Sequence, residues 1–160
     1  MNNRQYTIKQ ISYLSKEDCR FMKPCLISWL KNPKILNFFS PEMTFPFSFS
    51  TWLRHYRGFS NSKTFVILKK DWIIGHASFI IDDNKVKIFH VFIDTKYRRK
   101  RLATHLITQI QKYHEGLKTN YFYSNIISKN EPAKKLFEFL KYRGSSDTIK
   151  NNSIKYYKMK

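Results

Sequence analysis

The sequence predicts a single α/β domain with a mixed, mostly antiparallel central sheet flanked by helices. Between residues 64 and 94, apolar and polar residues alternate with a period of two, which is typical of strands. Before and after that region, apolar residues recur at helical spacing, so helices and strands follow one another along the chain. A chain of 160 residues can bury one real core but is too short for two ordinary domains.

The N-terminal quarter is predicted to form one strand and then a helix. YTIKQISYL (6–14) mixes β-branched and aromatic residues with polar ones, as a half-buried strand does. Ser15 is expected to cap the helix, with Asp18 three residues later as in a capping box. Pro24 is expected to divide this helix or to begin a new one, because proline lacks an N–H group and clashes with the preceding turn.

Two further helices are expected before the sheet. One follows Pro33, where a proline suits the first helical turn. Residues 40–50, with two prolines, read as a loop. Ser50 is then expected to cap a helix that ends near Gly58.

The remainder of the chain predicts an antiparallel meander followed by alternating helices and strands. The helix after the third meander strand is expected to cross over, which would make the strands on either side of it parallel. The expected strands are 64–70, 72–81, 86–94, 119–127 and 153–159, and the expected helices are 103–114 and 131–140.

The composition favours a folded protein with polyanionic ligands. Hydrophobic residues make up 42% of the chain and aromatic residues 17%, which excludes a disordered chain. The net charge of +19 suits nucleic acid, a ribosomal surface, an anionic membrane surface or a phosphate-rich cofactor. The lysines are spread along the whole chain, and an AT-rich genome would give the same composition, so charge alone does not choose among these ligands.

No apolar run reaches the roughly 18 residues that a membrane helix needs, and the polar start has no cleavable apolar segment. We therefore expect a cytoplasmic protein without a membrane span. The sequence does not predict its oligomeric state.

The stretch YRRKRLATHLI (97–107) places four adjacent cations between a predicted strand and a predicted helix. Free N–H groups at a helix N-terminus, together with the helix dipole, form an anion site for which phosphate is the usual guest. The alternative is a solvated basic loop, which is common in a chain this cationic.

Two motifs at this turn and in the following helix resemble those of a known family. Arg98, Arg101 and Ala103 fit the pattern Gln/Arg-x-x-Gly-x-Gly/Ala except at its first glycine. The pattern Asn-x-x-Ala-x-x-Leu-Tyr-Glu is matched by Asn130, Ala133, Leu136, Phe137 and Glu138. With the order of elements, these motifs resemble the Gcn5-related N-acetyltransferase (GNAT) superfamily, especially its ribosomal-protein and small-amine branches, from about Ile8 to the end of the chain.

The resemblance implies acetyl-CoA as cofactor and direct transfer of its acetyl group to a primary amine in a ternary complex. The strand before the turn would pair with the pantetheine arm as an added strand would, and the N–H groups of the turn would surround the pyrophosphate. The implied cofactor-binding residues are Val91, Phe92, Ile93, Arg98, Arg99, Lys100, Arg101, Leu102, Ala103, Thr104, Asn130 and Phe137.

The departures from the family pattern concern chemistry more than binding. Arg101 stands at a glycine position, which we expect to be compensated by its phosphate-binding guanidinium in a turn that needs no left-handed residue. Phe137 replaces the tyrosine that many members use to protonate the departing thiolate, and Asn125 replaces a frequent glutamate. A proton acceptor therefore has to be found elsewhere.

His90 is the first candidate, because it interrupts the predicted apolar strand face formed by Val86, Ile88 and Phe92. Each candidate also has a structural alternative, namely a histidine hydrogen-bonded inside the sheet or a tyrosine in ordinary packing, and some family members work with positioning and an ordered water alone. One of the two adjacent tyrosines of the last strand should point inward and could replace the missing acid. The candidates for proton transfer are His90, Glu42, Tyr156 and Tyr157, with His76 and Tyr97 as weaker ones.

Two function classes follow from the sequence. The first is an N-acetyltransferase whose amine acceptor is a small molecule or a protein N-terminus. An anionic acceptor suits a +19 chain better than a cationic one, since only 11 Asp and Glu residues are available to build an acidic pocket. The second is a catalytically degenerate module of the same fold that binds CoA, RNA or a ribosomal surface.

Overall fold

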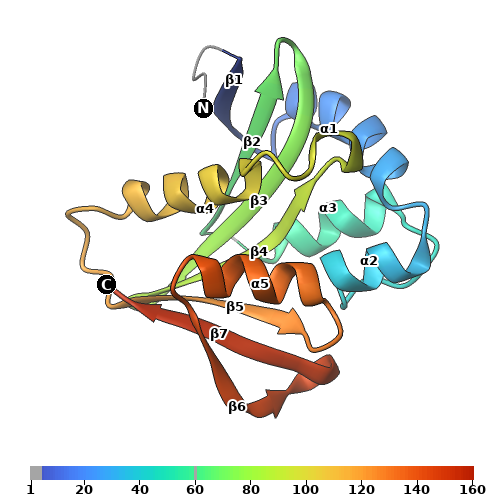
Figure 1. The fold of residues 1–160 in the computed structure, drawn as a ribbon. Helices are drawn as coiled ribbons and strands as arrows, with labels where there is room; N and C mark the ends of the chain where they lie inside the picture. Colours follow the sequence, from blue (N-terminus) through green and yellow to red (C-terminus); the bar gives the residue numbers. More distant parts are fainter. Residues whose placement is uncertain (1–4, 60) are drawn as a thin grey trace.

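A seven-stranded sheet forms the centre of the computed structural model, which describes residues 5–59 and 61–160 (Figure 1). The strand order is β1-β2-β3-β4-β5-β7-β6, and every neighbouring pair is antiparallel except β4 and β5. The strands are β1 (Tyr6–Ile11), β2 (Ser62–Lys69), β3 (Trp72–Asp82), β4 (Lys85–Ile93), β5 (Tyr121–Ile127), β6 (Arg143–Ile149) and β7 (Ser153–Met159). The α/β class and the mostly antiparallel sheet are as predicted.

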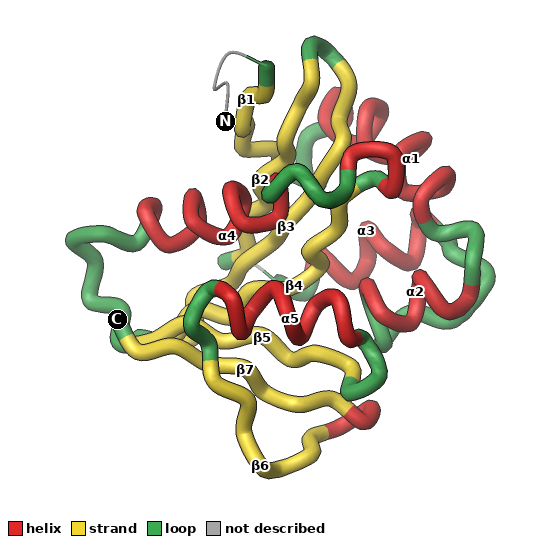
Figure 2. The backbone as a smooth tube through the Cα atoms, in the orientation of Figure 1, coloured by secondary structure: helices red, strands yellow, loops and turns green. Residues whose placement is uncertain are grey.

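Helices cover both faces of the sheet and enclose two hydrophobic cores (Figure 2). One face packs against α4 (Leu102–Tyr113) and α5 (Glu131–Phe139). The other face packs against α1 (Lys16–Trp29), α2 (Pro33–Phe39) and α3 (Phe49–Arg57). Among the described residues, no helix is long and apolar enough to cross a membrane.

The predicted break at Pro24 is wrong, because α1 continues through it from Lys16 to Trp29. Met22, Leu26 and Trp29 form a buried stripe at helical spacing, whereas Pro24 lies on the exposed face. Burial of the stripe outweighs the one backbone hydrogen bond that proline cannot donate. The predicted cap at Ser15 is confirmed, since its side chain accepts a hydrogen bond from the Asp18 N–H.

Two other predictions need correction. The cap of α3 is Ser48 and not Ser50, because the Ser48 hydroxyl accepts the Thr51 N–H and Ser50 already lies within the helix. β6 was not predicted, because Gly144, Ser145 and Ser146 have low strand propensity. This segment is extended because it pairs with β7, which therefore lies inside the sheet and not at its edge.

β4 and β5 separate soon after they begin. The helix α4 crosses over between them, as predicted, and the two strands run parallel. Their pairing covers only Lys85–Lys87 with Tyr121–Tyr123, although β4 continues to Ile93 and β5 to Ile127. The sheet therefore opens between the C-terminal halves of these two strands (Figure 1).

Candidate active site

A β-bulge in β4 directs His90 to the face of the sheet that α1, α2 and α3 cover. His76 pairs with Phe92 and Ser78 pairs with Phe89, so three residue steps on β4 oppose two on β3. His90 takes up the extra residue with a left-handed φ of 51°, a conformation that costs free energy and often marks functional sites. The prediction that His90 shares one face with Val86 and Ile88 is therefore wrong, because strict alternation ends at the bulge.

His90 is 5% exposed, and both of its ring nitrogens have partners. Nδ1 lies 2.8 Å from the Tyr56 hydroxyl on α3, and Nε2 lies 3.0 Å from the hydroxyl of Ser40, which follows α2. Ser40 in turn donates to Glu42 Oε2 at 3.3 Å. Behind Tyr56, the hydroxyl of Ser78 lies at 2.6 Å, and a further hydroxyl, that of Thr64, lies 2.8 Å from Ser78.

The chemistry of these groups fixes the direction of every hydrogen bond in the chain. The carboxylate of Glu42 can only accept, so Ser40 donates to it and accepts from His90 Nε2–H. His90 is neutral, because burial holds its pKa well below the usual value, with the nearby His76 adding to the effect. Its Nδ1 therefore accepts from the Tyr56 hydroxyl. One continuous relay runs from the interior of the sheet to Glu42 at the surface.

His76 supports the bulge from the neighbouring strand. It is fully buried, and its Nδ1–H donates to the backbone carbonyl of His90 at 2.7 Å. Since Nδ1 carries the proton, Nε2 accepts from the Tyr13 hydroxyl at 2.8 Å. Burial lowers the pKa of His76 to about 4, against the opposing effect of its bond to His90. The role of His76 is structural, because its hydrogen bond to the His90 carbonyl holds the left-handed backbone of the bulge.

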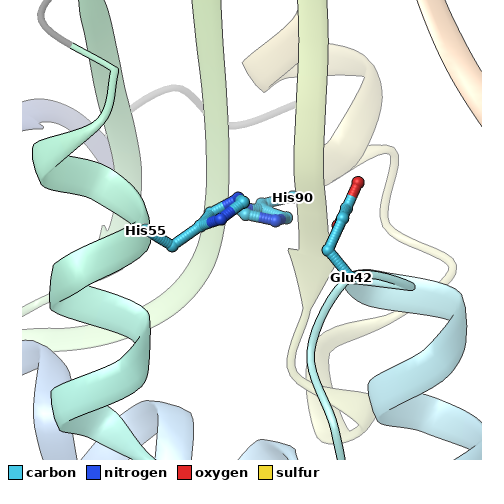
Figure 3. Close-up of side chains that lie close together, drawn as sticks. All are labelled: Glu42, His55 and His90. Atoms are coloured by element: carbon cyan, nitrogen blue, oxygen red, sulfur yellow. The ribbon is translucent and has the colours of Figure 1, made fainter.

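Glu42, His55 and His90 converge from the loop after α2, from α3 and from β4 (Figure 3). One potential metal-ligating atom of each lies within 4.8 Å of the other two. Both nitrogens of His90 are already engaged by hydroxyl groups, so hydrogen bonding accounts for its position.

Pro41 explains why α2 ends at Ser40, because a residue before proline avoids the helical conformation. Ser40 accordingly ends α2 with φ −147° and ψ 86°.

A cavity of about 340 Å³ lies where β4 and β5 separate, and the described parts of both strands line it. Its wall contains the proposed proton-transfer residues Glu42 and His90. It also contains Val91, Asn130 and Phe137, three of the predicted cofactor-binding residues. Five of the predicted residues thus line one cavity, in which predicted cofactor-binding residues and titratable side chains share a wall.

The basic turn between β4 and α4 adopts a tight conformation with two left-handed residues. Arg99 has φ 62°, and Arg101 has φ 59° and ψ 23° at the N-cap of α4. The expectation that the turn needs no left-handed residue is therefore wrong. The fold imposes the geometry of a glycine on Arg101, at a cost of about 1–2 kcal/mol for a residue with a Cβ atom. The side chains of residues 98–101 are exposed, so their charges face solvent.

Arg98 is held by the end of β4. The Asp94 N–H donates to the backbone carbonyl of Ile74 on β3. The N–H and C=O groups of one trans peptide, here those of Asp94 and Ile93, point in opposite directions. The carbonyl of Ile93 thus points away from β3, where Arg98 Nε donates to it at 3.0 Å. The guanidinium also lies 5.2 Å from the centre of the Phe92 ring. Among the described residues, no hydrogen bond from its terminal N–H groups is seen, so these groups could bind an anion.

Asn130 is the N-cap residue of α5, and Phe137 lies in the last turn of that helix. Asn130 caps this helix, since its Oδ1 accepts the Ala133 N–H at 3.3 Å, and its amide nitrogen is not used in the cap. Phe137 is 2% exposed and packs edge-on against Tyr142, with ring centres 4.9 Å apart. It offers no hydroxyl to the cavity.

The remaining predicted residues lie elsewhere. Tyr156 points inward as expected, but its hydroxyl donates to Glu138, and neither Tyr156 nor Tyr157 is among the described residues of the cavity wall. Ser40 and Tyr56, which link His90 to the rest of the relay, were not predicted from the sequence. Serine before proline is a signal for the first, whereas Tyr56 is buried at helical spacing from Trp52 and carries no signal of its own.

Comparisons with known proteins give the family and the fold of the chain. The sequence profile described as the Acetyltransferase (GNAT) family matches residues 32–142. No curated protein sequence matches the chain. Among solved structures, a domain from Methanocaldococcus jannaschii DSM 2661 has a TM-score of 0.80 at 18% identity, covering 98% of this chain and 99% of that one.

Two similar structures contain CoA. PaiA N-acetyltransferase from Thermoplasma acidophilum in complex with coenzyme A has a TM-score of 0.71 at 11% identity, covering 97% of this chain and 99% of that one. Spermidine N-acetyltransferase from Vibrio cholerae in complex with CoA and spermine has a TM-score of 0.71 at 17% identity, covering 98% and 96%. At these identities the likeness shows the fold. The family profile matches more than half of the chain, and the chain therefore belongs to the GNAT family of acetyltransferases, whose cofactor is acetyl-CoA.

Proposed function

We propose that the protein is an N-acetyltransferase that moves the acetyl group of acetyl-CoA to a primary amine by direct attack in a ternary complex. One observation carries this proposal: the cavity between β4 and β5 combines three cofactor-motif residues with a carboxylate and a histidine that share a hydrogen-bond relay. A cavity of about 340 Å³ is at the lower end of the range for small-molecule sites.

The residues present fit acetyl-CoA. The opening between β4 and β5 leaves room for an added extended segment beside Val91, Phe92 and Ile93. The exposed cations 98–101 lie at the N-terminus of α4, where backbone N–H groups and the helix dipole favour a phosphate. Leu102, Ala103 and Thr104 form the first turn of that helix. Acetyl-CoA, when bound, supplies an acetyl group activated as a thioester.

We assign the proton acceptor to Glu42. It is exposed at the cavity wall, whereas His90 is buried and its basic Nδ1 already accepts from Tyr56. An ammonium group that enters the cavity can give its proton to the Glu42 carboxylate, which leaves the amine nucleophilic. Ser40 and His90 act as positioning residues, because their hydrogen bonds hold that carboxylate toward the cavity.

Calorimetric titration with acetyl-CoA tests the cofactor site. Arg98→Ala combined with Arg101→Ala should weaken binding at least ten-fold, because two of the cations at the phosphate site are lost. The matched control removes the exposed Lys9 and Lys16, which lie on β1 and at the start of α1. Equal losses from both pairs would mean that diffuse charge binds the cofactor, not a formed site.

Release of free CoA thiol in the presence of amines tests catalysis. Glu42→Gln should lower kcat by about 100-fold or more, which is the usual contribution of a general base, and leave acetyl-CoA affinity unchanged. Glu17→Gln, an exposed glutamate in the first turn of α1, should have no effect. Ser40→Ala should lower kcat less and shift the pH profile of kcat, since it releases Glu42 without removing it.

The second candidate is a module that binds without catalysis. It is supported by Phe137, which stands where many family members have a tyrosine, and by Arg101, which stands at a glycine position. If acetyl-CoA binds and no amine is acetylated, this second function replaces the first. The slope of RNA affinity against salt would then separate a defined nucleic-acid site from general charge attraction.

A further inference from the structure

The charges around the cavity are unbalanced. Among the described residues of its wall, Glu42 is the one carboxylate, whereas Lys87 and Lys150 contribute two ammonium groups. Lys87 is half-buried on β4, and Lys150 lies in the turn between β6 and β7. A ligand that carries only positive charge would meet one partner and two repelling groups here, inside a chain with a net charge of +19.

We propose that the acceptor is a compact amine that also carries a carboxylate or phosphate beside an apolar body, as an aromatic amino acid does. This inference rests on the proposed acetyl transfer. Glu42 would take the ammonium group, and the lysines would take the anion. The acceptor is then neutral or negative overall, in contrast to a polyamine.

The rest of the wall supports the apolar part of this ligand. Phe38 on α2, Phe59 after α3 and Phe89 on β4 contribute aromatic rings from three separate elements. All three are half-buried, so parts of their rings are accessible. Aromatic rings bury a large apolar area and stack well on flat groups. The volume of about 340 Å³ suits a small molecule and is too small for a folded partner.

Long polyamines would have no such match in this wall. Their repeated ammonium groups need several carboxylates at intervals, and the described part of the wall offers one. A simple apolar amine would satisfy Glu42 and the phenylalanines but would leave both lysines without an anion. The lysines therefore act as specificity determinants, since they distinguish amines that are otherwise alike.

The test compares amines that differ only in the anionic group. L-phenylalanine, L-phenylalaninamide and 2-phenylethylamine share a ring and an amine, and O-phosphoethanolamine and ethanolamine form the corresponding phosphate pair. We expect kcat/KM to be at least ten-fold higher for the anionic member of at least one set, and spermidine to be slower than that member. The two sets tell whether the anion is a carboxylate or a phosphate.

Variants assign the effect to the lysines. Lys150→Glu, at an exposed turn where folding is least affected, and Lys87→Met should each raise KM for the anionic amine, whereas KM for its counterpart without the anion, a simple cation, should not rise, because a repelling ammonium group is lost. Lys118→Glu, the same charge reversal at an exposed position outside the wall, should change neither.

The outcomes separate this inference from the function on which it rests. If the anionic member of neither set is acetylated faster than its counterparts without the anion, or if spermidine is acetylated as fast as the faster anionic amine, the inference is overturned and acetyl transfer stands. If acetyl-CoA binds and none of the six amines is acetylated, both the inference and the proposed transfer are overturned.

Discussion

Acid should lower the free energy of unfolding of this protein, because His76 is buried beside the bulge and must be protonated there at low pH. Its ordinary pKa of about 6.5 applies to the unfolded chain, and burial lowers the pKa in the folded protein to about 4. The unfolded chain therefore binds the proton more tightly than the folded one. The stabilisation by neutral His76 is fully present above pH 6.5 and is lost progressively as the pH falls toward 4.

The magnitude follows from the two pKa values. A gap of about two to three pKa units, at about 1.4 kcal/mol for each unit, corresponds to about 3 kcal/mol. Burial also lowers the pKa of His90 and of His114, so both residues add to the loss in the same direction. Since the whole free energy of unfolding of a typical domain is about 5–15 kcal/mol, a loss of this size should markedly destabilise the protein near pH 4.

Urea denaturation at a series of pH values from above 6.5 down to 4 measures this loss. His76→Gln keeps an amide donor and acceptor at the site but cannot titrate, so the free energy of unfolding should fall less steeply with acid than in the wild type. His105→Gln, on the half-buried side of α4, provides a histidine control outside the relay. An identical pH dependence in the wild type and in His76→Gln would refute the reasoning.

Three further predictions concern stability, each measured by urea or thermal denaturation. Tyr56→Phe should lower the free energy of unfolding by about 1–3 kcal/mol, because His90 Nδ1 and the Ser78 hydroxyl lose their buried partner; an unchanged value would argue against the relay. Arg101→Gly should raise it by about 1 kcal/mol, since glycine adopts the left-handed conformation without a Cβ clash; a decrease would show that the side chain contributes more than the strain costs. Gly75→Ala should lower it by about 1–3 kcal/mol, because the new Cβ would lie 2.6 Å from both Ile67 Cγ2 and Ile93 Cδ1 in the core; a neutral result would mean that these isoleucines can move.

The features that the sequence predicts well are those that depend on residues close together in the chain. Helix α4, the cap at Ser15 and the crossover between β4 and β5 all follow from local spacing and element order. The two motifs lie in short continuous stretches, so the sequence could name Asn130 and Phe137 as candidate cofactor-binding residues, and both line the cavity.

Features that depend on distant partners could not be predicted. β6 is extended because β7 pairs with it, and its own residues disfavour a strand. Ser40 and Tyr56 belong to the relay because they meet His90 across 50 and 34 positions of the chain. The face that His90 occupies depends on one extra residue in β4, and a period-two pattern contains no information about such a residue.

The bulge in β4 divides that strand into two halves with opposite phase. Before it, even-numbered Val86 and Ile88 pack toward α4, and after it, even-numbered Phe92 packs toward α1 and α2. Removal of one residue at the bulge would restore regular pairing but exchange core and opposite-face side chains along one half of the strand. A sequence alignment or a redesign of this chain should therefore keep every residue of β4. It should also shift the expected alternation between the two faces of the sheet by one position at His90.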